Sequence, residues 1–186
     1  MEAIRNIEIN KVAKVILIAA LGTLLLTLSA KIKIPFYPVP MTMQTFVVLF
    51  LGIILGKKIG LLTVSLYLFE GIFGLPVFAG TPEKGIGIVY FTGPTMGYLL
   101  GFLVSVYVAG FFKYEKGFLT NFFKLIFAVS FIYILGLIWL GLLIGWDKPI
   151  FKLGAEPFLL AELFKILLLS FLMPIILKVK KITKIT

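Results

Sequence analysis

The chain has 186 residues, 61% of them hydrophobic and 14% charged, and its mean hydropathy of +1.14 excludes an ordinary soluble domain and indicates an integral membrane protein. The absence of Cys and His excludes thiol and imidazole catalysis, disulfides and the usual zinc or haem ligands, so we expect no metal and no cofactor. The net charge of +10 comes from lysines at the ends of apolar runs, so we expect no nucleic-acid partner.

Six apolar runs are each expected to cross the membrane as a helix. A hydrocarbon core about 30 Å thick requires about 20 apolar residues per helical crossing, which leaves only short connections in a chain of this length. The first run is not expected to be a signal peptide, because no small-residue cleavage pattern follows it and five more runs do. The expected spans are Val12–Ala30, Met43–Gly56, Ile59–Phe78, Pro94–Phe112, Phe118–Gly145 and Pro157–Leu177.

The distribution of basic residues predicts the orientation of these spans. With the N-terminus in the cytoplasm, 12 of the 18 basic residues fall on the inner side, 5 on the outer side, and Lys165 lies inside a span. A bias of this size normally sets topology. The sequence therefore predicts an all-α, six-transmembrane-helix bundle that forms a single domain over residues 1–186. Both termini should be cytoplasmic, in a multi-pass protein of the prokaryotic cytoplasmic membrane that contacts lipid.

The outer connections carry the features of binding loops. In the first, Lys31 to Met41, three prolines exclude a regular helix and favour a stiff extended segment. The second, Gly80 to Gly93, mixes glycines, one acid, one base and two aromatics. Phe36 and Tyr90 in these loops are candidates to cover a ligand ring, although residues of an interfacial aromatic belt would look the same.

Residues typical of helix starts and ends occur on the same side and indicate a polar pocket. Gly74, followed by Leu75 and Pro76, predicts the end of the third span. Thr42, Gly93–Pro94 and Glu156–Pro157 predict the starts of the second, fourth and sixth spans. Three helix N-termini would then offer N–H groups to a carboxylate or carbonyl, but any six-span protein with this topology shares that arrangement.

Charged residues within the spans are the next signal. Glu162 and Lys165 are three residues apart on the sixth span, so they share one helix face. Inserting either charge costs about 2.5–3.5 kcal/mol, whereas an i,i+3 pair returns only about 0.2–0.5 kcal/mol. We expect a polar cavity or a ligand to supply the difference; the alternative is an interfacial pair with a snorkelling lysine. Glu70, in the last turn of the third span, needs a local partner, for which Lys84 or Lys165 is a candidate.

Weaker candidates complete the expected site. Thr42, Gln44 and Tyr98 could offer hydrogen bonds to a small solute, although capping, interhelical bonding or interface anchoring would explain them nearly as well. A stripe of small residues on the first span, formed by Ala19, Thr23 and Thr27, could dock a partner helix or pack internally.

The chain offers no nucleotide site of its own. The glycines and lysines between Gly52 and Lys58 have the wrong spacing for a phosphate-binding loop, and Lys58 stands where Ser or Thr is required. Energy for uphill transport would therefore have to come from elsewhere.

Four motifs give the chain a family resemblance. They are PFYPVPMTMQT (Pro35–Thr45), GLPVFAG (Gly74–Gly80), GPTMGYLLGF (Gly93–Phe102) and GLIWL (Gly136–Leu140). In this order and spacing the chain resembles BioY, the family of biotin transporters that act as substrate-binding S components of energy-coupling factor (ECF) systems. Glu162 stands where the family more often has Asp, Met96 replaces a commoner Gly, and Thr81–Gly85 replaces a glycine-rich loop.

The resemblance implies uptake of biotin from outside, with no enzymatic activity. It also implies a transmembrane coupling subunit and two ATPase subunits as partners, although some members operate without them. By the same likeness Glu162 and Lys165 match ligand-binding positions. Glu162 would accept from a ureido N–H, Thr42, Gln44 or Tyr98 would donate to the ureido carbonyl, and Lys165 or Lys84 would pair with the carboxylate. Alternatives are another small vitamin, an integral-membrane enzyme acting on lipid, or a purely structural subunit.

Overall fold

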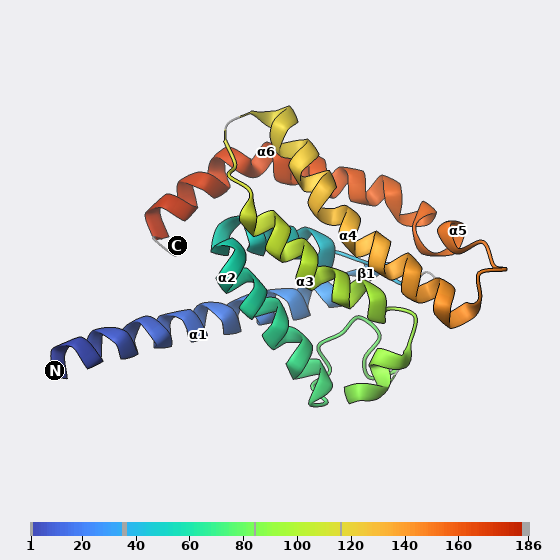
Figure 1. Cartoon of the computed structure of the whole chain (residues 1–186), viewed down its shortest axis with the longest axis horizontal. Helices are drawn as coiled ribbons and strands as arrows, with labels where there is room; N and C mark the ends of the chain where they lie inside the picture. Colours follow the sequence, from blue (N-terminus) through green and yellow to red (C-terminus); the bar gives the residue numbers. More distant parts are fainter. Residues whose placement is uncertain (1, 35–36, 84, 116, 184–186) are drawn as a thin grey trace.

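The computed structural model describes residues 2–34, 37–83, 85–115 and 117–183 (Figure 1). It is built from helices, with a two-stranded antiparallel ladder between the first two. In chain order the two strands and the long helices are α1 (Glu2–Lys31), β1 (Lys33–Ile34), β2 (Met41–Thr42), α2 (Gln44–Ile72), α3 (Met96–Phe111), α4 (Phe118–Ile144) and α6 (Leu159–Thr183). Three short helices, η1 (Gly87–Thr92), α5 (Ile150–Gly154) and η2 (Glu156–Phe158), lie in the connections.

α2 is two helices that meet at a reversal. Gly56 has φ 72° and ψ 174°, a backbone conformation that interrupts the helix and favours glycine. Gln44 Nε2 donates to Tyr67 Oη at 2.7 Å, although the two residues are 23 apart in sequence. An unbroken helix would separate them by roughly 34 Å. The two halves therefore run antiparallel, as the predicted break between Gly56 and Ile59 requires.

Close helix packing at this reversal depends on small residues. A Cβ on Gly52 would lie 2.7 Å from the Val106 carbonyl oxygen and 2.8 Å from Ala109 Cβ of α3, and a Cβ on Gly110 would collide with the Lys57 backbone. Glycine thus lets the α2 hairpin and α3 approach at backbone distance. The buried core formed by α2, α3, α4 and α6 is continuous, and α1 packs mainly on α2.

The lengths of the helices correct some of the predicted spans. By length and composition four helical segments of the described chain can cross a membrane: Val12–Lys31, Gln44–Ile72, Phe118–Ile144 and Ile150–Ile182. α3 has 16 residues, about 24 Å, and is therefore shorter than the full crossing expected for it. The predicted third span also continued too far, since α2 ends at Ile72.

The end of α2 agrees with the glycine stop predicted from the sequence. The helix ends at Ile72, and Gly74, two residues later, has φ 93°, so the stop is confirmed. The start of α1 and the end of α6 lie on one side of the bundle, and α5 and the 73–95 connection lie toward the other (Figure 1). Large apolar side chains face outward on α1, α4 and α6, as expected for a multi-pass membrane protein.

Candidate substrate-binding site

A pocket opens at the end of the bundle where α2, α3 and α6 begin. Its wall includes Thr42 and Gln44 at the start of α2, Thr95 before α3, and Glu162 in the first turn of α6. The structure therefore brings together the three helix starts that the sequence marks. Most of the remaining wall is apolar or aromatic, and such a lining suits a small organic solute held by few polar groups.

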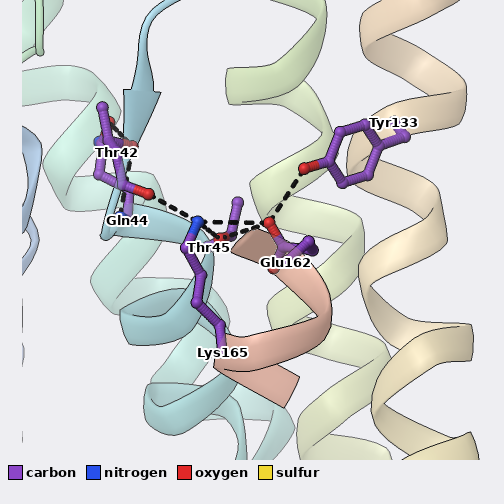
Figure 2. Close-up of polar contacts among 6 residues, drawn as sticks. All are labelled: Thr42, Gln44, Thr45, Tyr133, Glu162 and Lys165. Atoms are coloured by element: carbon purple, nitrogen blue, oxygen red, sulfur yellow. Dashed lines mark hydrogen bonds and ion pairs between the residues drawn. The ribbon is translucent and has the colours of Figure 1, made fainter. Parts of the chain in front are cut away.

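Glu162 and Lys165 form the polar centre of this pocket. Glu162 is 4% exposed and Lys165 is 8% exposed, and Lys165 Nζ lies 3.4 Å from Glu162 Oε2. Figure 2 shows the pair pointing from α6 toward Thr45 at the start of α2 and toward Tyr133 on α4. The two charges face the protein interior, so the alternative of an interfacial pair with a snorkelling lysine does not describe them.

The two oxygens of the Glu162 carboxylate have different surroundings. Thr45 Oγ1 donates to Oε2 at 2.9 Å and Tyr133 Oη donates to the same atom at 3.0 Å, in addition to the Lys165 contact. Oε1 is buried and accepts no hydrogen bond from the described residues. Three donors thus fix the carboxylate through Oε2, whereas Oε1 has no donor among the described residues.

Lys165 is held by three acceptors. Its Nζ donates to the Thr42 carbonyl oxygen at 2.7 Å, to Thr45 Oγ1 at 3.0 Å and to Glu162 Oε2 at 3.4 Å. An ammonium group has three N–H donors, so this geometry uses all of them. Lys165 therefore neutralises and positions Glu162 here, and pairing with a ligand carboxylate would require it to exchange one of these bonds.

Gln44 connects the pocket to the segment that follows α2. Its Oε1 accepts from Thr42 Oγ1 at 3.2 Å, and its Nε2 donates to Tyr67 Oη at 2.7 Å. Tyr67 Oη in turn donates to the Val77 carbonyl oxygen at 3.0 Å. These consecutive hydrogen bonds hold the backbone at Val77, next to Phe78, which lines the pocket.

Two lysines, the last residue of α1 and the first residue of β1, hold the same segment from outside. Lys31 Nζ donates to the carbonyl oxygens of Phe78 at 3.0 Å and Thr81 at 3.2 Å, and Lys33 Nζ donates to that of Ala79 at 2.8 Å. Backbone carbonyls in a non-helical segment lack the regular partners of a helix, and these ammonium groups supply partners for three of them. The first connection and the 77–81 segment are thereby joined over the pocket.

Aromatic side chains cover the apolar side of the pocket. Phe78 stacks on Tyr90 with ring centroids 4.8 Å apart, and the Tyr90 hydroxyl accepts from the Gly80 N–H at 3.3 Å. Burial raises the pKa of Tyr90, so its phenol stays neutral at physiological pH. Tyr98 also lines the pocket, but its hydroxyl donates to the Gly154 carbonyl oxygen at 2.8 Å and is not free for a ligand.

Several predicted site residues lie elsewhere. Glu70 is absent from the pocket wall, and its Oε1 accepts from Thr23 Oγ1 of α1 at 2.9 Å, whereas Lys165, one of the two lysines expected beside it, bonds to Thr42, Thr45 and Glu162. Lys84 and Phe36 lie outside the described residues.

The small-residue stripe on α1 faces the chain's own interior. Ala19 is 1% exposed and Thr23 is 4% exposed, so internal packing accounts for both. Thr27 is half-buried and donates to the Thr23 carbonyl oxygen. A contact between this stripe and a partner helix remains a prediction.

Thr45, Tyr133 and Thr95 belong to the pocket although sequence reasoning did not select them. Thr45 and Thr95 lie within the family motifs, three residues after Thr42 and three before Tyr98, so a search of the motifs for every hydroxyl would have found them. Tyr133 sits in the middle of an apolar helix and gives no local signal, because its contact with Glu162 joins residues 29 apart.

The fold and the pocket define a multi-pass helical membrane protein with a buried, charged solute-binding pocket at one end of its bundle. The chain belongs to the BioY family, whose model matches residues 3–182, so the resemblance drawn from the motifs is confirmed.

Relatives cover most of the chain. "Probable biotin transporter BioY" of Pyrococcus horikoshii is 35% identical over 82% of this chain and 90% of its own length. "Biotin transporter BioY" of Thermotoga maritima is 35% identical over 88% of this chain and 94% of its own. A crystal structure of "the S-component for biotin from an ECF-type ABC transporter" has the same fold, with a TM-score of 0.73, 24% identity and coverage of 94% of this chain and 93% of that one.

Proposed function

We propose that the chain binds biotin at the outer face of a prokaryotic cytoplasmic membrane, as the substrate-binding subunit of an ECF-type transporter. The observation that carries this proposal is the buried Glu162 carboxylate, whose Oε2 takes three donors while Oε1 takes none from the described residues. The names of the relatives and of the structural neighbour supply the solute and the transporter class.

The pocket has groups that suit the chemistry of biotin. Its ureido ring carries two N–H donors, and Glu162 Oε1 would accept one of them in a charge-assisted hydrogen bond. Phe78 and Tyr90 would cover the fused rings, and Gln44 Nε2 retains a second N–H that could serve the ureido carbonyl. Lys165 and Tyr133 would act by fixing Glu162, because their own polar atoms are already engaged with protein groups.

The proposed topology is a six-segment bundle with both termini in the cytoplasm. The two halves of α2 count as separate crossings, and α1, α3, α4 and α6 supply the others. The lysine asymmetry supports this orientation, which places the pocket toward the outside, where biotin arrives. Surrounding lipid would cover the outward apolar faces.

Energy for uptake would come from separate subunits. The sequence has no phosphate-binding loop, and the S-component likeness supports a transmembrane coupling subunit with two ATPase subunits as partners. The chain itself is not an enzyme: its family and its structural neighbour consist of transporter components, which argues against the lipid-modifying alternative.

Equilibrium binding of labelled biotin to the detergent-purified chain tests the proposal. Biotin should compete fully, whereas thiamine and riboflavin should not, since neither has biotin's five-membered ring with two ureido N–H donors. Absence of labelled-biotin binding, together with binding of labelled thiamine or riboflavin by the same sample, would favour a transporter for another solute. No binding of any vitamin by a monodisperse, folded sample would favour a structural subunit.

A further inference from the structure

A second hollow lies at the end of the bundle opposite the pocket. It is formed by the end of α3, the 112–115 connection and the C-terminal part of α6. We define it as the basic groove, lined on its charged side by Lys113, Lys178, Lys180 and Lys181. It shares no residue with the substrate pocket, and nothing in the proposed uptake of biotin uses it.

Positive charge dominates the exposed side of this groove. Lys113, Lys178 and Lys181 line it beside one acid, Glu115, and no ion pair involves that acid within the described ranges. Lys113, Lys178 and Lys181 are exposed, and the last two are three residues apart on one face of α6. Like charges held together in this way favour an anion between them.

One of the four lysines has a structural role. Lys180 Nζ donates to the Ile53 carbonyl oxygen at 2.8 Å. Because the first half of α2 ends at Gly56, this carbonyl lies among those that lose their intrahelical partner, and an ammonium group at a helix C-terminus also suits the helix dipole. Lys180 thus connects α6 to α2 and is one of the lining residues of the groove.

The 112–115 connection is held in shape by polar contacts. Asn121, 1% exposed, donates from Nδ2 to the Glu115 carbonyl oxygen at 2.6 Å and accepts from the Glu115 N–H at 3.4 Å. Lys124 Nζ donates to the Lys113 carbonyl oxygen at 2.6 Å. The wall that carries Lys113 is therefore fixed before any ligand arrives, which lowers the entropic cost of binding.

The groove also contains a donor without an acceptor and an apolar wall. The Tyr114 hydroxyl is buried and has no hydrogen-bond partner in the part of the chain that the structure describes. Phe111, Pro174 and Leu177 supply an apolar part of the groove lining, and the first two are exposed. An occupant therefore needs phosphate-like oxygens at one end and hydrocarbon at the other.

We propose that the basic groove binds the headgroup phosphate of an anionic phospholipid, with the first carbons of an acyl chain against Leu177 and Pro174. A soluble phosphate would match the lysines but would leave the apolar wall unused. Lipids with a net negative headgroup, such as phosphatidylglycerol, combine both features. By the lysine asymmetry this end of the bundle faces the cytoplasmic leaflet.

Binding of dioleoyl phosphatidylglycerol to the purified full-length chain tests this site by native mass spectrometry, with dioleoyl phosphatidylcholine as the neutral comparison. The wild type should retain phosphatidylglycerol preferentially. The double variant Lys178→Gln/Lys181→Gln should bind it about 25-fold more weakly, since each lysine near an anionic headgroup contributes roughly fivefold. Lys14→Gln/Lys58→Gln removes the same charge from exposed positions at the same end of the bundle, outside the groove, and should bind as the wild type does within twofold.

Several outcomes would overturn the proposal. Equal weakening in both double variants would mean general surface attraction, and displacement of the lipid by equimolar glycerol phosphate would mean a site for soluble anions. If lipid binding is unchanged but Lys178→Gln/Lys181→Gln no longer co-purifies with a coupling subunit, the groove is a protein interface. Helix content and monodispersity of each variant are checked first, and Lys113→Gln provides an independent variant on the other wall.

Discussion

Replacing Glu162 with Gln changes the polar centre with little change in shape. In the native pocket, Oε2 accepts from Thr45, Tyr133 and Lys165, and Oε1 accepts from none of the described residues. A glutamine carbonyl would take the Oε2 position, because all three neighbours donate there. Its NH₂ group would then occupy the Oε1 position and present a donor where the ligand also presents a donor.

The expected loss of affinity follows from this exchange. A hydrogen bond to a charged group contributes about 1.5–3 kcal/mol, so its removal should raise the Kd for biotin roughly 10- to 150-fold. The variant also leaves the Lys165 ammonium without its counter-ion. Breaking a buried pair commonly costs about 3–5 kcal/mol, and the Thr42 and Thr45 oxygens that still accept from Lys165 should keep the loss at or below the lower end of that range.

The assay is equilibrium binding of labelled biotin, with thermal unfolding measured on the same samples. Glu156→Gln is the matched control, because Glu156 is an exposed acid in the short helix just before α6 and is absent from the pocket wall. It should leave both the Kd and the unfolding temperature unchanged. If Glu162→Gln lowers the unfolding temperature but keeps the Kd within twofold of wild type, Glu162 is a structural group and our reading of its free oxygen is wrong.

Three further changes probe the same pocket. Lys165→Ala should weaken biotin binding about 10-fold or more, since Glu162 loses its counter-ion and the three hydrogen bonds of the ammonium group disappear. A Kd equal to that of the wild type would show that the lysine only stabilises the fold. Tyr133→Phe should lower stability by about 1.5–3 kcal/mol and weaken binding several-fold, whereas Tyr107→Phe, at an exposed tyrosine of α3, should change neither in the same two assays. Gly71→Ala should cost about 1–3 kcal/mol of stability and weaken binding, because the new Cβ collides with the Phe78 ring. Its control is Gly117→Ala, whose new Cβ meets nothing closer than 3.6 Å and which should change stability by no more than about 0.5 kcal/mol. Equal effects of the two variants in thermal unfolding would contradict the packing argument.

Local chemistry explains why much of the fold could be read from the sequence. Runs of apolar residues identify lipid as the solvent because backbone groups in hydrocarbon must pair within a helix. The stop at Gly74 and the break after Gly56 depend on the conformational freedom of single glycines, which any sequence displays directly. Glu162 and Lys165 share a face because helical spacing alone requires it. The residues that should bind a solute were therefore identifiable as a pair.

The tertiary structure decided which polar atoms of Glu162 and Lys165 have hydrogen-bond partners within the protein. Thr45 reaches Glu162 across 117 residues and Tyr133 across 29, and both contacts are to Oε2, so Oε1 has no donor among the described residues. Helix packing likewise brings the Thr23 hydroxyl to the Glu70 carboxylate and the Tyr98 hydroxyl to the Gly154 carbonyl oxygen, where each donates a hydrogen bond. Such pairings depend on how separate helices pack against each other, and helical periodicity, which is a property of one segment at a time, contains no information about them.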